Sequence, residues 1–127
     1  MNKRASILIG SDEPAVVDTL RLLLTTAAQD GKAFEFTTSS RADDFIQQAR
    51  SGRYDLAILH ANCLVPTRPF TLLEQAVLAV RNIKAFRSVR LVVLTTMEEW
   101  DSPLRASGAD VCLKAPFDAN EILAAVL

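Results

Sequence analysis

The chain has 127 residues and a mass of 13.9 kDa, the size of one domain that can hold its own hydrophobic core. Hydrophobic residues make up 50% and charged residues 23%, which excludes a disordered chain, a collagen and a disulfide-rich scaffold. With 14 basic and 15 acidic residues the net charge is -1, so there is no basic excess for binding a nucleic acid backbone.

No apolar stretch approaches the ~20 residues of a membrane helix. Residues 1–14 lack the long apolar region and the small-residue cleavage site of a secretory signal. The two cysteines, Cys63 and Cys112, predict no disulfide framework and suit a reducing compartment. We therefore expect one cytoplasmic domain over residues 1–127, with no membrane or nucleic acid partner.

Short apolar runs alternate along the chain with longer segments whose apolar residues recur at helical spacing. The short runs are rich in β-branched residues, which is typical of strands buried on both faces. Pro14 suits a first helical turn, while Ser40 and Asp118 are typical helix caps. We expect strands at residues 7–10, 33–38, 55–60, 89–94 and 111–113, and helices at 14–30, 41–51, 71–84, 98–107 and 119–127.

Strands that alternate with helices predict a parallel sheet covered on both faces, because parallel neighbours need helical crossovers. The predicted fold class is therefore α/β, a doubly wound three-layer α/β/α sandwich. In such folds the functional crevice lies beyond the carboxyl ends of the strands. The segments at those ends are residues 10–14, 60–66, 95–96 and 114–117.

Four segments, which read ILIGSDEP, YDLAILH, VVLTT and SGADVCLKAPFD, resemble the receiver domain of two-component response regulators. The resemblance extends over essentially the whole chain and implies a flavodoxin-like fold, with a five-stranded parallel sheet in the order 2-1-3-4-5. It also implies a chemistry. Receivers accept a phosphoryl group from a histidine kinase onto an aspartate after the third strand, with help from acidic residues and Mg²⁺, a Thr or Ser, and a Lys.

At the acceptor position of that pattern the chain has His60, whose imidazole cannot form an acyl phosphate. The acidic, metal-binding positions fall on Ser11 and Asp12, so one of the usual carboxylates is missing. A single carboxylate is a poor site for Mg²⁺, and we expect no cofactor. Thr95 retains the position that contacts the phosphoryl group.

The basic position is also lost, because it falls on Ala115 while Lys114 stands one residue earlier. In a strand, one position turns the side chain to the other face, although a bulge would restore it. The aromatic residue that usually reorients on phosphorylation corresponds to Cys112. The sequence therefore predicts a degenerate pseudo-receiver that is not an enzyme and that acts through protein contacts in bacterial phosphorelay signalling.

Two other functions stay open at this stage. One is a receiver that still responds to Mg²⁺ or a phosphoryl group through Asp12 and Thr95. The other is a small-ligand or metal-binding domain of the same fold, since the side chains of His60, Asp12 and Cys63 are all zinc ligands. Their spacing is not that of a metal site. The simpler interpretation is that His60 is hydrogen-bonded to Asp12 or to the backbone, and a pair with Asp12 would raise its pKa.

Two residues are candidates for a partner surface. Trp100, flanked by acidic residues, is either a core residue or an anchor for a partner, and Arg68 lies in a proline-containing loop. The expected partner is a signalling kinase, an output domain or another regulator. The resemblance also allows homodimers that pair through the last helices.

Overall fold

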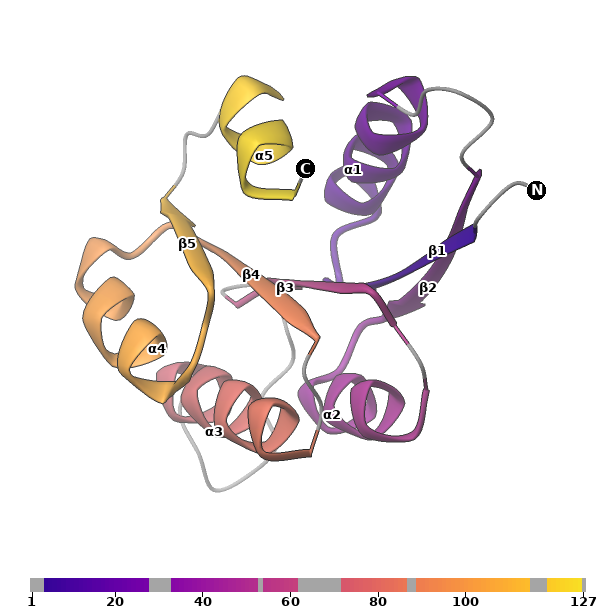
Figure 1. Ribbon diagram of the computed structural model, residues 1–127. Coiled ribbons are helices and arrows are strands. Elements are labelled where there is room, and N and C mark those ends of the chain that lie inside the picture. Colours follow the sequence, from indigo (N-terminus) through magenta and orange to yellow (C-terminus); the bar gives the residue numbers. More distant parts are fainter. Residues whose placement is uncertain are drawn as a thin grey trace.

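A single parallel sheet between two layers of helices forms the protein in the computed structural model (Figure 1). The structure describes residues 4–27, 33–52, 54–61, 72–86, 89–114 and 119–126. Its strands are β1 (Arg4–Gly10), β2 (Ala33–Ser39), β3 (Leu56–His60), β4 (Arg90–Thr95) and β5 (Val111–Lys114). Its helices are α1 (Pro14–Ala27), α2 (Ala42–Ser51), α3 (Leu72–Phe86), the 3-10 turn η1 (Glu98–Trp100), α4 (Asp101–Ser107) and α5 (Ala119–Val126).

The strand order is β2-β1-β3-β4-β5, and every neighbouring pair is parallel. The predicted fold class and strand order are therefore confirmed. The pairing aligns Gly10 with Leu59, His60 with Leu94, and Thr95 with Lys114. The register thus brings the carboxyl ends of β1, β3, β4 and β5 to one edge of the sheet.

Each face of the sheet is covered by its own apolar core. In β3, Ala57 and Leu59 pack toward α2, α3 and α4, while Leu56 and Ile58 pack toward α1 and α5 (Figure 1). All five residues of β3 are buried, which explains why its sequence is a continuous apolar run. Among the described residues, no helix is long and apolar enough to cross a membrane.

The structure corrects two details of the sequence prediction and decides a third, the place of Trp100. β1 begins at Arg4 because residues 4–6 pair with residues 33–35 of β2, although their composition gives no strand signal. The residue before α2 is Arg41, not Ser40, and it makes no side-chain capping hydrogen bond. Trp100 was a candidate partner anchor, but it is 9% exposed and belongs to the core with Leu104 and Cys112. Its burial leaves little aromatic surface for a partner.

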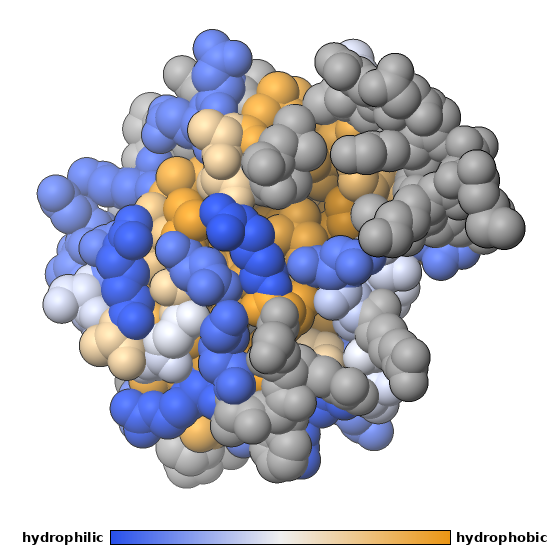
Figure 2. Space-filling view, viewed as in Figure 1, coloured by the Kyte–Doolittle hydropathy of each residue, from blue (hydrophilic) through white to orange (hydrophobic). Residues whose placement is uncertain are grey.

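An apolar cleft of about 200 Å³ lies between α1, α5 and β4 and is lined by Val16, Leu94 and Ile122, among others. Hydrophobic side chains reach the surface between α1 and α5 in Figure 2. The hydroxyl of Thr19, which also lines the cleft, donates to Ala15 O at 2.7 Å. The Thr19 hydroxyl is therefore already hydrogen-bonded within α1. The lining of the cleft is mainly apolar, in contrast to the polar edge of the sheet that holds His60.

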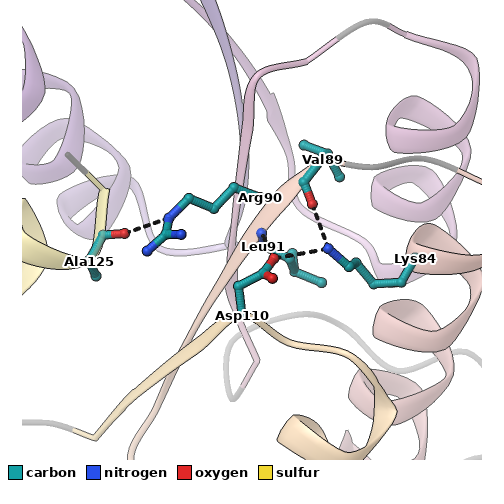
Figure 3. Close-up of polar contacts among 6 residues, drawn as sticks. All are labelled: Lys84, Val89, Arg90, Leu91, Asp110 and Ala125. Carbon is teal, nitrogen blue, oxygen red and sulfur yellow. Dashed lines mark hydrogen bonds and ion pairs between the residues drawn. The ribbon is translucent and has the colours of Figure 1, made fainter.

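Hydrogen bonds tie the amino end of β4 to three other elements (Figure 3). Asp110 accepts from Leu91 N at 2.7 Å and from Lys84 Nζ at 3.0 Å, which links β4, α3 and the turn before β5. On the other side of the strand, Arg90 Nε donates to Ala125 O of α5 at 2.9 Å. We refer to the hydrogen bonds that join Lys84, Arg90, Leu91, Asp110 and Ala125 as the amino-edge clamp.

Candidate functional site

His60 ends β3 at the carboxyl edge of the sheet and is only 6% exposed. Its Nδ1 lies 3.1 Å from Ser11 Oγ, and Ser11 is also buried. The same hydroxyl accepts a hydrogen bond from Glu13 N at 3.1 Å. A serine hydroxyl can accept two hydrogen bonds and donate one, so Ser11 can bond Glu13 N and the imidazole at once, whichever neutral tautomer His60 has.

Burial lowers the pKa of His60 below its ordinary value of 6.5, and the nearby carboxylates of Glu13 and Asp12 oppose this shift without reversing it. The imidazole is therefore neutral at pH 7. This corrects two expectations. Ser11 rather than Asp12 is the side chain that bonds the ring, and the pKa is lowered rather than raised. Desolvation outweighs the attraction of two exposed carboxylates.

The residues present do not fit Mg²⁺. Magnesium is bound by oxygen ligands and prefers carboxylates, but Ser11 and His60 contribute a hydroxyl and an imidazole, and only the exposed carboxylates of Asp12 and Glu13 lie near them. Within the described ranges, no three His, Cys, Asp or Glu side chains gather closely enough for a metal ion. Cys63, the third member of the zinc hypothesis, lies outside the described residues.

Thr95 ends β4 and is 2% exposed. Its hydroxyl accepts a hydrogen bond from Met97 N at 3.0 Å, which caps the turn that follows the strand. This is the local backbone role that a Thr at a strand end commonly takes.

Lys114 is directed away from His60. Its Nζ lies 3.2 Å from a carboxylate oxygen of Glu98, and both side chains are exposed. Lys114 stands two residues after Cys112, which packs against the α2–α4 side, whereas His60 stands two residues after Ile58, which packs against α1 and α5. Strand alternation therefore places the ammonium group and the imidazole on opposite faces of the sheet.

Cys112, which the resemblance matches to the reorienting aromatic of receivers, is a buried free cysteine. Burial raises the pKa of its thiol to about 11, assisted by Asp101 and opposed by Arg105. The thiol is consequently protonated at neutral pH, and a protonated thiol is a poor nucleophile and metal ligand. Its small side chain fills core space beside Trp100 and Leu104.

No protein-family model matches the chain, and no curated protein matches it significantly. Solved structures do. A CheY-like response regulator receiver domain protein from Methanospirillum hungatei superposes with a TM-score of 0.72 at 18% identity, over 98% of this chain and 91% of that one. The chain has the receiver-domain fold.

Two further receiver structures give the same result. The receiver domain of a sensor histidine kinase from Pseudomonas aeruginosa, which holds magnesium in its active-site cleft, has a TM-score of 0.73 at 19% identity, with 96% and 93% coverage. The chemotaxis response regulator CheY4 of Vibrio cholerae has a TM-score of 0.71 at 23% identity, with 98% and 97% coverage. At these identities the likeness concerns the fold.

Within this receiver fold, the structure brings His60, Ser11 and the exposed Asp12 to the same end of the sheet. Thr95 lies at the same end, on β4, which is the neighbour of β3. It separates Lys114 from them. Ala115 and Arg68 lie outside the described residues, so their positions in the site stay predictions. Sequence reasoning missed the buried Ser39, whose carbonyl accepts from Ser11 N at 2.9 Å and fixes that loop. Only the strand register reveals this contact.

Proposed function

We propose that the chain is a receiver-like module of two-component signalling that works through protein contacts and does not accept a phosphoryl group at the usual position. The receiver fold over nearly the whole chain supports the signalling part of this proposal. The module carries no catalytic activity of its own, and its partner is a signalling kinase, an output domain or another regulator.

The hydrogen-bonded pair of His60 and Ser11 carries the proposal. Phosphoryl transfer to a receiver needs a carboxylate nucleophile and a cation that neutralises the transferred oxygens. Here an uncharged imidazole and a hydroxyl occupy the positions of two carboxylates and satisfy one another at 3.1 Å. Burial keeps the imidazole neutral, so the pair lacks the negative charge that would attract Mg²⁺.

The position of Lys114, the one lysine at the carboxyl end of a strand among the described residues, supports the same conclusion. Lys114 is engaged with Glu98 at 3.2 Å on the opposite face of the sheet. A phosphoryl group on the His60 side would therefore lack a lysine partner from β5. The loss of nucleophile, metal ligand and counter-ion together is what an abandoned phosphorylation site predicts.

Backbone-amide NMR tests the proposal directly. We expect the amides of Ser11, Asp12 and Thr95 to keep their chemical shifts when Mg²⁺ and then a beryllofluoride phosphoryl mimic are added. Saturable Mg²⁺-dependent shifts at Asp12 and Thr95 would contradict the proposal and favour a functional receiver. Saturable zinc shifts at His60 would instead favour a metal-binding domain.

The double variant Ser11→Asp/His60→Asp serves as the matched control, because it returns both carboxylates to the same backbone. We expect this variant to show Mg²⁺-dependent shifts that the natural chain lacks, since two carboxylates are added beside Asp12. Equal Mg²⁺ affinities of the two proteins would show that His60 and Ser11 do not decide the chemistry of this edge.

A further inference from the structure

A polar hollow lies next to the His60 pair, outside the carboxyl ends of β1 and β2. Its volume is about 390 Å³, within the ~300–1,000 Å³ range of small-molecule sites. α1 and α2 begin at this end of the sheet and lie on opposite faces of it (Figure 1). The hollow therefore has walls from both helices, with Asp18 and Val17 on α1 and Asp44 on α2.

Three carboxylates line the hollow: those of Asp12, Asp18 and Asp44. All three side chains are exposed, and none forms an ion pair or a side-chain hydrogen bond within the described residues. Arg41, the basic residue beside α2, is paired with Asp43 at 3.3 Å and does not line the hollow. A recess lined by one sign of charge concentrates ions of the other sign.

A buried hydroxyl that lacks a partner borders the same hollow. Ser39 is 3% exposed, and its Oγ is the one buried side-chain oxygen or nitrogen without a hydrogen bond among the described residues. Leaving such a group unpaired is unfavourable. The oxygen is covered in this structure, but if the Ser39 side chain turned toward the hollow, a ligand with N–H groups would supply the missing bond. This observation is independent of the charges and points to a ligand.

We propose that this hollow binds an organic polycation whose ammonium groups are separated by methylene segments, as in a polyamine. A single metal ion does not suit it, because no three carboxylates of the described residues gather around one point. Separate ammonium groups can reach separate carboxylates through charge-assisted hydrogen bonds. The apolar walls from Pro14 and Val17 suit the methylene segments between them.

Calorimetric titration of the whole chain with spermidine tests this proposal, with Mg²⁺ alone and a trilysine peptide as parallel titrations. We expect saturable spermidine binding with amide shifts at Ser39, Asp18 and Asp44. The trilysine titration identifies the source of the ammonium groups: tighter binding than spermidine assigns them to lysine side chains of a protein, and weaker binding assigns them to a free polyamine. Spermidine binding that does not saturate would overturn the proposal.

The neighbouring aspartates of α2 provide a matched pair of variants. Asp44→Asn removes a carboxylate that lines the hollow, whereas Asp43→Asn removes the same charge one residue away, outside it. We expect Asp44→Asn to raise the spermidine Kd about tenfold and Asp43→Asn to leave it within about twofold. Equal effects of the two variants, or binding of Mg²⁺ in place of spermidine, would overturn the proposal. The spermidine outcomes do not depend on phosphorylation at His60, so a failure of spermidine binding overturns this proposal and leaves the proposed function standing.

Discussion

The two ends of the sheet differ in how their polar groups are used. At the amino edge, the clamp pairs Asp110 with Leu91 N and Lys84, and Arg90 with Ala125 O (Figure 3). At the carboxyl edge, the buried groups form a small uncharged chain through Ser11, while Asp12, Asp18 and Asp44 have no side-chain partner among the described residues.

This difference separates structure from function. At the amino edge, the hydrogen-bonded charged side chains connect α3, β4, α5 and the turn before β5 and contribute to the stability of the fold. Unpaired acids at the carboxyl edge contribute little to stability and leave that edge available for ligands or partners. Variants at the amino edge should consequently change the free energy of unfolding, and variants at the carboxyl edge should mainly change binding.

The largest loss of stability is expected for Asp110→Ala. The change leaves the Leu91 N–H and the Lys84 ammonium without their shared carboxylate, which we expect to lower the free energy of unfolding by about 2–3 kcal/mol. Unfolding in denaturant measures this change in the free energy of unfolding. Asp101→Ala is the control, because its exposed pair with Arg105 is worth less than about 0.5 kcal/mol. Similar losses in the two variants would contradict a special role for the clamp.

The same carboxylate makes stability depend on acid pH. Burial tends to raise the pKa of Asp110, but the hydrogen bond from Leu91 N and the contacts with Lys84 outweigh it, so the pKa is lowered overall. A carboxyl group whose pKa is lowered by folding stabilises the fold at pH values above its pKa in the unfolded chain. This contribution to stability is lost as the pH falls below about 4. We therefore expect Asp110→Asn to flatten the acid limb of the stability curve.

Gly10→Ala is expected to destabilise the carboxyl edge of the sheet by a steric clash, without a change of charge. A Cβ at Gly10 would lie 2.4 Å from Cδ2 of Phe45, whose ring is fully buried. We expect a loss of about 2 kcal/mol from overpacking, measured by thermal unfolding. Combining it with Phe45→Leu makes room for the methyl group. A combined loss equal to the sum of the two single losses would show that the contact with Phe45 is not the cause.

At the carboxyl edge, His60 should also make the stability of the protein depend on pH, but near neutral pH and not in acid as Asp110 does. Because burial lowers its folded pKa, the unfolded chain takes up the proton first, and stability should fall as pH decreases through the ordinary value of 6.5. His60→Asn should remove this part of the pH profile between about pH 5 and 7. A profile that is unchanged in the variant would mean that the imidazole is not buried in its neutral form.

The smallest effect is expected for Lys114→Gln. Its ion pair with Glu98 joins two exposed side chains, so the loss should stay below about 0.5 kcal/mol in denaturant unfolding. A loss above about 1 kcal/mol would mean that the Lys114 ammonium group belongs to a buried network and not to this exposed ion pair. That result would contradict the description of Lys114 as a surface residue directed away from His60.

Sequence reasoning reached the fold because the strand order follows from the alternation of apolar runs and helices and from the four receiver-like segments. It missed the start of β1, where residues 4–6 pair with residues 33–35 of β2 although the sequence there has no apolar run. It also left Trp100 undecided, because acidic neighbours in sequence do not reveal that η1 directs the indole into the core.

For the site, the sequence identified the positions of His60, Ser11 and Lys114 but not their interactions. The Ser11 hydrogen bond and the lowered pKa of His60 depend on burial and on loop geometry, which have no local sequence signal. The hollow lined by Asp18 and Asp44 was missed for a related reason. Its walls come from α1 and α2, which are far apart in the chain and are brought together by the pairing of β1 with β2.

Intact-mass measurement after incubation with acetyl phosphate and Mg²⁺ tests the central claim most directly. We predict that the natural chain keeps its mass, because the acceptor position holds a neutral imidazole bonded to Ser11. A mass increase of one phosphoryl group that disappears in Asp12→Ala would contradict this account.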